Sequence, residues 1–266
     1  MQTVQSRDGT RIAYERTGTG PPLIFVHGGW DGHTAWSLVF PPLNQQFTVY
    51  AMDRRGCGLS DPYQDDYAME RDFEDVASLV DLIGEPVHLV GHSIGALSAL
   101  HGALLTPNIR SLTLYEPPLG GPEIAPAEVI DRIESLVRAG DRDGAAVAFI
   151  HEVVGVPWTE VEHQRASPTW SARLAGIHSV PTGLRAAGLF RFEPLRLQAL
   201  DIPTLLLTGS DSTPYHKGTV ATVANALPHS QITVLQGQQH NANVTAPDLL
   251  AEQILLFLAA RSEIGQ

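Results

Sequence analysis

The chain has 266 residues, 43% of them hydrophobic, so it can bury one large core with or without an insertion. Its 17 basic and 29 acidic residues give a formal net charge of −12, which argues against nucleic acid or an anionic membrane as a partner because both need basic patches. The single cysteine, Cys57, excludes an intramolecular disulfide.

Short apolar runs that end at glycine or at turn residues recur along the chain and predict strands. Residues 6–18 contain an Asp-Gly turn followed by alternating residues, which is typical of a β-hairpin. The runs that predict buried strands are 21–29, 47–56, 86–91, 109–118, 203–211 and 230–237.

Segments with the spacing of helices separate these strands. Residues 70–84 predict an amphipathic helix that ends at Gly84 as its C-cap. A helix rich in alanine and leucine follows residue 95, and residues 217–228 and 246–260 predict two more. Because strands alternate with helices, we expect an α/β fold whose parallel sheet is covered on both faces.

The alternation stops between residues 119 and 198. This interval is rich in helix formers and proline and contains no clear buried strand. We interpret residues 119–198 as a helical lid inserted over the sheet, and residues 1–118 and 199–266 as the core.

The pentapeptide GHSIG, residues 91–95, stands between a predicted strand and a predicted helix and matches G-x-S-x-G. Such a tight turn puts the serine in a strained backbone conformation, and the flanking glycines relieve the crowding. The start of the helix then favours negative charge near the hydroxyl. We therefore interpret Ser93 as a nucleophile; the alternative is a serine that only caps the helix.

With this motif the chain resembles the α/β-hydrolase superfamily over nearly its whole length. The landmarks come in the family's order: HGGW at 27–30, DRRGCGLSD at 53–61, GHSIG at 91–95, LYEPP at 114–118, LLLTGSD at 205–211 and GQQH at 237–240. The resemblance implies the α/β-hydrolase fold, a mostly parallel sheet of about eight strands flanked by helices, with a helical lid.

A serine hydroxyl needs a general base to act as a nucleophile at neutral pH. His240 is the candidate because it follows the last predicted strand, in the loop where the family keeps its catalytic histidine. His92, inside the elbow, is interpreted as structural. The other histidines considered are interpreted as surface or lid residues: His33, His101, His151, His163, His178, His216 and His229.

Two carboxylates compete for the role of the acid that orients the histidine. Asp211 follows the predicted strand where the family usually keeps its acid, but it comes one position early, and Ser212 fills the expected place. Glu116 ends the strand after the nucleophile helix, where certain haloalkane dehalogenases place their acid. We favour Glu116 slightly, because the Asp211 loop looks shortened. The alternatives are a salt bridge at a lid hinge for Glu116 and a turn cap for Asp211.

The segment HGGW predicts an oxyanion hole. Its glycines, Gly28 and Gly29, allow backbone N–H groups to turn toward the site. By resemblance the donors are the N–H groups of Gly29 and of Ile94, with Trp30 close by or on the pocket wall. Such donors stabilise the charge that builds on the substrate oxygen in the transition state.

The segment DRRGCGLSD is interpreted as architectural. Its glycines allow a tight loop that Asp53 or Arg55 can hold together by hydrogen bonds. Cys57 within it is interpreted as an inert small residue rather than a nucleophile.

Ser93, His240 and an acid with two N–H donors support acyl transfer through an acyl-enzyme. Esters, lactones and thioesters are the natural substrates, and an apolar lid indicates a small or medium hydrophobic substrate. The lid side chains concerned, most of which also serve to pack it, are Phe149, Trp158, Trp170, Leu174, Ile177, Leu184, Leu189, Phe190 and Phe192.

Several other functions share this pattern. They are carbon–carbon bond hydrolases, cofactor-free haloperoxidases (perhydrolases), hydroxynitrile lyases and proline iminopeptidases, although the iminopeptidases usually carry tryptophan where Ile94 stands. A non-catalytic small-molecule receptor or a biosynthetic template of the same fold is a further alternative.

We expect a small-molecule substrate and no cofactor or metal, because no metal-binding spacing such as H-E-x-x-H occurs. The first residues lack the apolar run of a signal peptide, and no stretch is long enough to span a bilayer, so we expect a cytoplasmic protein without a membrane partner. Both a monomer and a homodimer fit the sequence.

Overall fold

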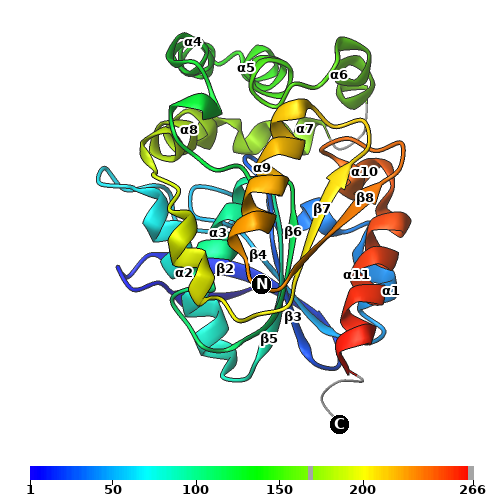
Figure 1. Cartoon of the computed structure of the whole chain (residues 1–266). Helices are drawn as coiled ribbons and strands as arrows, with labels where there is room; N and C mark the ends of the chain where they lie inside the picture. The colour runs from blue at the N-terminus through cyan, green and yellow to red at the C-terminus, as the bar shows by residue number, and fades with distance from the viewer. Residues whose placement is uncertain (167–169, 263–266) are drawn as a thin grey trace.

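The computed structural model of the chain describes residues 1–166 and 170–262 and contains an eight-stranded sheet (Figure 1). The strand order is β1-β2-β4-β3-β5-β6-β7-β8. Strand β2 is antiparallel to β1 and β4, and the remaining neighbours are parallel. The strands are β1 Gln2–Gln5, β2 Arg11–Gly18, β3 Pro22–Val26, β4 Thr48–Met52, β5 Val87–His92, β6 Ile109–Tyr115, β7 Thr204–Gly209 and β8 Ser230–Leu235. This confirms the predicted hairpin and the predicted α/β sheet.

Helices cover both faces of the sheet, as the continuous apolar strands require. Helices α2, α3 and α9 lie on one face, where their side chains pack with Ile24 and Leu114. Helices α1 and α11 lie on the other, where they pack with Phe25 and Leu207. The core helices are α1 Phe40–Leu43, α2 Met69–Ile83, α3 Ile94–Gly102, α9 Pro214–Ala226, α10 Ala242–Thr245 and α11 Pro247–Ser262, with 3-10 helix η1 at His33–Trp36.

Strand β8 differs from the prediction of a buried strand. Ile232 and Val234 are 46% and 44% exposed. Strand β8 is the last in the sheet order and pairs only with β7. Apolar periodicity cannot distinguish an edge strand from a central one, since both carry β-branched residues.

The connection from β6 to β7 forms a group of helices above the carboxyl ends of the strands (Figure 1). In its described part the regular structure is helical. The elements are η2 Pro122–Ile124, α4 Ala127–Arg138, α5 Arg142–Ala148, η3 Phe149–Val153, α6 Trp158–Arg165, α7 Trp170–Arg173, η4 Leu174–Ser179, α8 Val180–Leu189 and η5 Pro194–Ala199. Trp30, from the core, is buried among these helices and joins them to the sheet.

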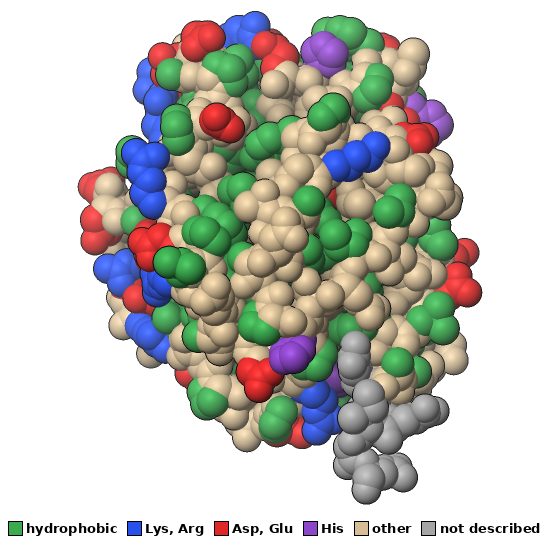
Figure 2. Space-filling model, viewed as in Figure 1, with side chains coloured by type: hydrophobic (Ala, Val, Ile, Leu, Met, Phe, Trp, Pro, Cys, Tyr) green, Lys and Arg blue, Asp and Glu red, His purple; other side chains and the backbone are tan. Residues whose placement is uncertain are grey.

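Several surface charges on this helical region form local ion pairs. Arg185 on α8 contacts Asp131 and Glu134 on α4, at 2.8 and 2.6 Å. Along the left edge of the face shown in Figure 2, Lys and Arg side chains lie beside Asp and Glu side chains. Exposed pairs of this kind contribute roughly 0–1 kcal/mol each, so they set local charge more than stability.

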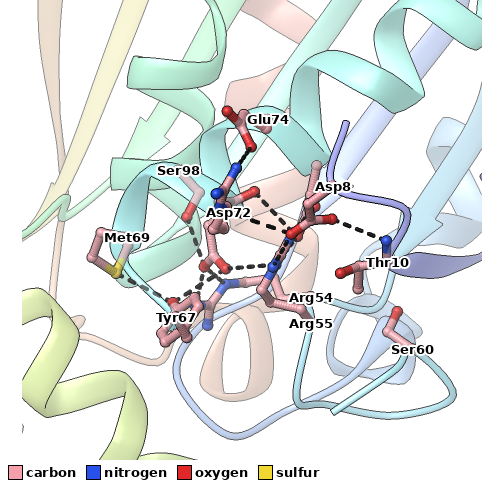
Figure 3. Close-up of polar contacts among 12 residues, drawn as sticks. Asp8, Thr10, Arg54, Arg55, Ser60, Tyr67, Met69, Asp72, Glu74 and Ser98 are labelled. Atoms are coloured by element: carbon pink, nitrogen blue, oxygen red, sulfur yellow. Dashed lines mark hydrogen bonds and ion pairs between the residues drawn. The ribbon is translucent and has the colours of Figure 1, made fainter. Parts of the chain in front are cut away.

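The loop after β4 is held by a buried group of charges (Figure 3). Arg54 donates from Nε to Asp72 on α2 at 2.9 Å, and its NH2 group makes a second, short bond to the same carboxylate. Arg55 donates to Asp75 at 2.7 and 2.6 Å and to Asp8 at 2.9 Å. The loop is therefore fastened to helix α2 by two paired guanidinium groups.

Arg54 also connects this cluster to the loop after β3. Its NH1 group donates to the carbonyl of Gly28 at 3.3 Å, and its backbone N–H donates to Nε2 of His27 at 3.0 Å. Asp53 accepts from the backbone N–H groups of His33 and Leu59 at 2.6 and 2.9 Å. The DRRGCGLSD segment thus supports the glycine loop beside Ser93.

Replacing Asp72 with asparagine is expected to destabilise the fold by about 3–5 kcal/mol, because the change leaves the Arg54 charge buried without its carboxylate. Arg54 is 2% exposed and Asp72 2% exposed. Chemical denaturation measures the loss. Glu70→Gln, an exposed change on the same helix, is the control and should stay within about 0.5 kcal/mol of the wild type. Equal stabilities for the two variants would contradict this account.

Candidate active site

Ser93 occupies a sharp turn between β5 and α3. Its backbone angles, φ 54° and ψ −129°, are strained for a residue other than glycine. A Cβ at Gly91 would lie 2.6 Å from the Cα of Ala96, and one at Gly95 would lie 2.2 Å from the carbonyl oxygen of His27. Both glycines are therefore required by close backbone approach, which explains the G-x-S-x-G spacing.

His240 lies in the loop after β8 and is 6% exposed. Its Nδ1 is 2.6 Å from Oε2 of Glu116. The backbone carbonyl of His240 accepts a hydrogen bond from Nε2 of His92 at 2.7 Å. The hydroxyl of Tyr115 donates to the neighbouring carbonyl of Gln239. The histidine loop is thus fastened to the ends of β5 and β6, in agreement with a structural role for His92.

Glu116 is fully buried at the end of β6, with φ at 45°. Its Oε1 accepts hydrogen bonds from the backbone N–H of Gly209 at 3.0 Å and from the hydroxyl of Thr208 at 2.8 Å. Burial opposes ionisation, but the hydrogen bond and charge of His240, with the nearby His216, outweigh it and lower the pKa of Glu116 to about 2. Glu116 is therefore a carboxylate directed at Nδ1 of His240.

Asp211, the other candidate acid, does not contact His240 in the described structure. Its side chain is exposed and accepts a hydrogen bond from the hydroxyl of Ser210 at 2.8 Å. Within the described chain it makes no hydrogen bond or ion pair with a histidine. Ser212, one position later, is buried, and a hydrogen bond from its hydroxyl helps to lower the pKa of Glu116. Of the two carboxylates considered, the structure brings only Glu116 to His240.

His216 is a residue of this site that the sequence interpretation missed. The prediction of a surface or lid position is wrong, because His216 is 6% exposed and lines the same cleft as Ser93 and His240. Its ring is stacked on that of His240, with centroids 4.2 Å apart and an 11° angle between planes. Thr213 caps helix α9 and places His216 in the first turn, at the carboxyl edge of the sheet. This N-cap threonine is the sequence signal that could have placed His216 at the start of a core helix.

His101 is also buried, contrary to the prediction, but lies away from this site. It packs against Phe73 and Phe190, at ring distances of 4.8 and 5.0 Å. It serves the packing of α2 and α3 against the helical region.

Two backbone N–H groups near Ser93 correspond to the predicted oxyanion-hole donors. Within the described residues, those of Gly29 and Ile94 donate to no protein acceptor. Gly28 and Gly29 follow β3, and a Cβ on Gly28 would approach the Cβ of Ser93 to 3.5 Å. Trp30 packs against Phe149 and lines a small pocket that Ser93 and His240 also line.

Ser93 and His240 line one cleft. Most of its wall is apolar, and most of the apolar lining residues come from the helical region. Of the lid side chains considered, Phe149 and Leu184 line it, whereas Trp158 and Leu189 are exposed, at 53% and 79%. The apolar lining residues of that region are Ile124, Phe149, Val153, Val154, Val180, Leu184 and Ala187. The arrangement suits an apolar group held next to the serine.

Glu116, His216 and His240 form the one described cluster whose ligand atoms lie within 4.8 Å of one another. A metal ion binds imidazole in the plane of the ring, through the nitrogen lone pair. The two rings here are nearly parallel and 4.2 Å apart, and Nδ1 of His240 already contacts Glu116. The geometry is that of a hydrogen-bonded stack rather than of convergent metal ligands.

The buried carboxylate makes stability depend on pH. Folding lowers the pKa of Glu116 from its usual 4.5 to about 2. The contacts of the ionised carboxylate therefore add about 3 kcal/mol to the free energy of unfolding above pH 5, and this contribution is lost as the pH falls toward 2. Urea denaturation of the wild type and of Glu116→Gln from pH 7 to pH 3 should show that the difference between their free energies of unfolding becomes smaller as the pH falls. A difference that does not change with pH would contradict the assignment of Glu116 as a buried carboxylate.

Comparison with known proteins agrees with this architecture. The model of the Alpha/beta hydrolase family matches residues 23–253. Non-heme chloroperoxidase CPO-A1 of Kitasatospora aureofaciens is 28% identical, over 93% of this chain and 95% of its own. The 2-(acetamidomethylene)succinate hydrolase of Mesorhizobium japonicum is 26% identical, over 91% and 90%.

The fold comparison gives the same result. The crystal structure of an alpha/beta hydrolase from Sphaerobacter thermophilus matches with a TM-score of 0.84 and 32% identity, covering 97% of this chain and all of that one. In the described residues no helix has both the length and the apolar character needed to cross a bilayer. A strained serine between strand and helix, a buried histidine and a family match over most of the sequence lead to one conclusion: the chain belongs to the alpha/beta hydrolase family.

Proposed function

We propose that the protein is a serine hydrolase that cleaves an ester, lactone or thioester of a small to medium hydrophobic substrate. The observation that carries this proposal is the 2.6 Å contact between buried Glu116 and Nδ1 of His240, which lines the same cleft as Ser93. An ionised carboxylate at Nδ1 keeps the proton there and leaves Nε2 free to act as a base.

The proposed reaction has two steps. Ser93 Oγ attacks the acyl carbon while His240 takes the hydroxyl proton and then gives it to the leaving oxygen or sulfur. Water attacks the acyl-enzyme, loses its proton to His240, and releases the acid and the free serine. The N–H groups of Gly29 and Ile94 hold the substrate oxygen when it becomes negative, each contributing about 3 kcal/mol.

The cleft wall supports the substrate class. Residues 119–198 act as the lid in this proposal, because they supply most of the apolar lining. The Mesorhizobium relative is named for a succinate derivative, which is a dianion at neutral pH. Here the cationic side chain on the cleft wall, Arg54, is already paired with Asp72. We therefore favour an uncharged acyl group over a dicarboxylate.

Labelling with a fluorophosphonate, followed by peptide mass spectrometry, tests the nucleophile. We expect modification of Ser93 and hydrolysis of p-nitrophenyl esters, with kcat/KM rising from acetate to medium acyl chains. A succinate half-ester should react more slowly than a neutral ester of equal length. Tight binding of a small molecule without labelling would instead support a receptor.

A second candidate is perhydrolysis, favoured by the similarity to the Kitasatospora chloroperoxidase. Hydrogen peroxide would attack the acyl-enzyme in place of water, forming a peracid and the free serine; the peracid would then oxidise halide. Halogenation of monochlorodimedone in acetate buffer with hydrogen peroxide and bromide measures this activity. Halogenation that is lost in Ser93→Ala, together with weak ester hydrolysis at every chain length, would favour this candidate.

A further inference from the structure

His240 is contacted by a second buried imidazole that the proposed mechanism does not use. The ring of His216 lies parallel to that of His240, 4.2 Å between centroids and 11° between planes. The two residues come from different elements, since His216 is on α9 and His240 is in the loop after β8. A ring held against one face of another restricts how the second ring can turn.

His216 is itself held in place. Its Nδ1 is 3.0 Å from the hydroxyl of Thr213, and the same hydroxyl oxygen accepts from the backbone N–H of His216 at 3.3 Å. Whichever of the two groups donates the proton, Nδ1 of His216 is hydrogen-bonded to Thr213. Nδ1 is thereby occupied, although it lies only 3.8 Å from Oε2 of Glu116.

In this arrangement Glu116 forms a hydrogen bond with only one of the two histidines, His240. The carboxylate faces both imidazoles, at 2.6 Å for His240 and at 3.8 Å for His216. Burial, reinforced by the charge of His240, lowers the pKa of His216 to about 3, so its ring is neutral at pH 7. When His240 takes the serine proton, the negative charge of Glu116 therefore faces one positive charge, that of His240.

We propose that His216 is a positioning residue, which holds the ring of His240 between Glu116 and Ser93 without exchanging a proton itself. The hydrogen bond at Nδ1 fixes one point of the His240 ring but still permits rotation about that bond. The parallel ring of His216 removes this freedom, so that Nε2 stays directed at the serine hydroxyl. The inference rests on the proposed function of the same site.

The other ionisable groups that touch His240 come from β5 and β6. His92 lies 4.6 Å away between ring centroids, and Tyr115 6.2 Å away. Burial, with repulsion from His240, lowers the pKa of His92 to about 3, and burial raises the pKa of Tyr115. Neither changes charge between pH 5 and pH 9, so a shift of the acid limb of kcat/KM reports on His240 and its stack.

Two variants distinguish the effect of the ring's shape from the effect of its nitrogen atoms. His216→Ala removes the ring, and we expect kcat to fall about 10- to 100-fold with KM within about threefold of the wild type. His216→Phe keeps a neutral flat ring, and kcat should stay within about threefold. Leu184→Ala, on the cleft wall away from the stack, is the matched control and should change KM more than kcat.

A readout that needs no turnover is the proton resonance of Nδ1–H of His240, shifted downfield by its contact with Glu116. It should persist in His216→Phe and broaden or vanish in His216→Ala, with both variants checked for folding by circular dichroism. Loss of kcat in both variants, or full kcat and an unchanged resonance in His216→Ala, would overturn the inference. If the wild type neither hydrolyses esters nor reacts with the phosphonate, the proposed function fails, and the resonance still decides whether His216 orders the ring.

Discussion

Ser93→Ala is expected to lower kcat for ester hydrolysis by about 10⁵- to 10⁶-fold, while the fold and substrate binding persist. The variant removes the only atom that forms the acyl bond, and the N–H groups of Gly29 and Ile94 remain to give a small residual rate. Alanine accepts the same strained backbone as serine, so the turn between β5 and α3 should be kept. Burst kinetics with a p-nitrophenyl ester measure the loss.

The control for this variant is Ser37→Ala, an exposed serine outside the cleft, which should leave kcat unchanged. Fluorophosphonate labelling should disappear in Ser93→Ala and persist in the control. A Ser93→Ala enzyme that keeps a tenth of the wild-type rate would refute the nucleophile, and with it the acyl-enzyme.

Glu116→Gln is expected to lower kcat by about three to four orders of magnitude, whereas Asp211→Asn should stay within about threefold of the wild type. Glutamine keeps the volume in the buried site but presents a neutral group, so the proton on Nδ1 of His240 is no longer held by charge. Asp211 is exposed and bonded to its neighbour Ser210, so its amide should leave His240 undisturbed. Steady-state kinetics of the two variants measure the difference.

The reverse result, a large loss in Asp211→Asn with a near-normal Glu116→Gln, would show that the loop after β7 moves to His240 during catalysis. A further change tests the same geometry. Ser212, one position after Asp211, is buried beside Glu116. In a Glu116→Gln background, Ser212→Asp should recover part of the lost kcat if a carboxylate at that position can reach the histidine.

Much of the fold could be predicted because its signals are local. A five-residue apolar run between turn residues, such as β3 at Pro22–Val26, buries every side chain only in a sheet covered on both faces. The C-cap glycine at Gly84 does adopt the left-handed conformation that ends α2, with φ at 75°. The exposure of β8 could not be predicted, because position within the sheet order is not a property of the strand's own residues.

The residues around His240 show where local signals end. His216 looked like one of several surface histidines, since nothing in its neighbours reports a ring from another loop stacked on it. Trp30, expected near the oxyanion hole or on the pocket wall, lines a small pocket with Ser93 and also anchors the helical region through Phe149 and Trp170, at 5.9 and 5.7 Å between rings. Both outcomes depend on contacts between segments more than 20 residues apart.

The sequence by itself determined the turn that presents Ser93, because the glycine at 91 meets backbone atoms of residues 95 and 96 within the same turn. Only the tertiary structure decided which carboxylate lies against His240. Glu116 and Asp211 follow neighbouring strands, β6 and β7, so both are near the same edge of the sheet. The backbone of Glu116 at φ 45° directs its side chain inward to the N–H of Gly209 and to His240, while the turn after β7 directs Asp211 to solvent. Side-chain direction at a strand end is set by the loop and its long-range hydrogen bonds, which no spacing in the sequence specifies.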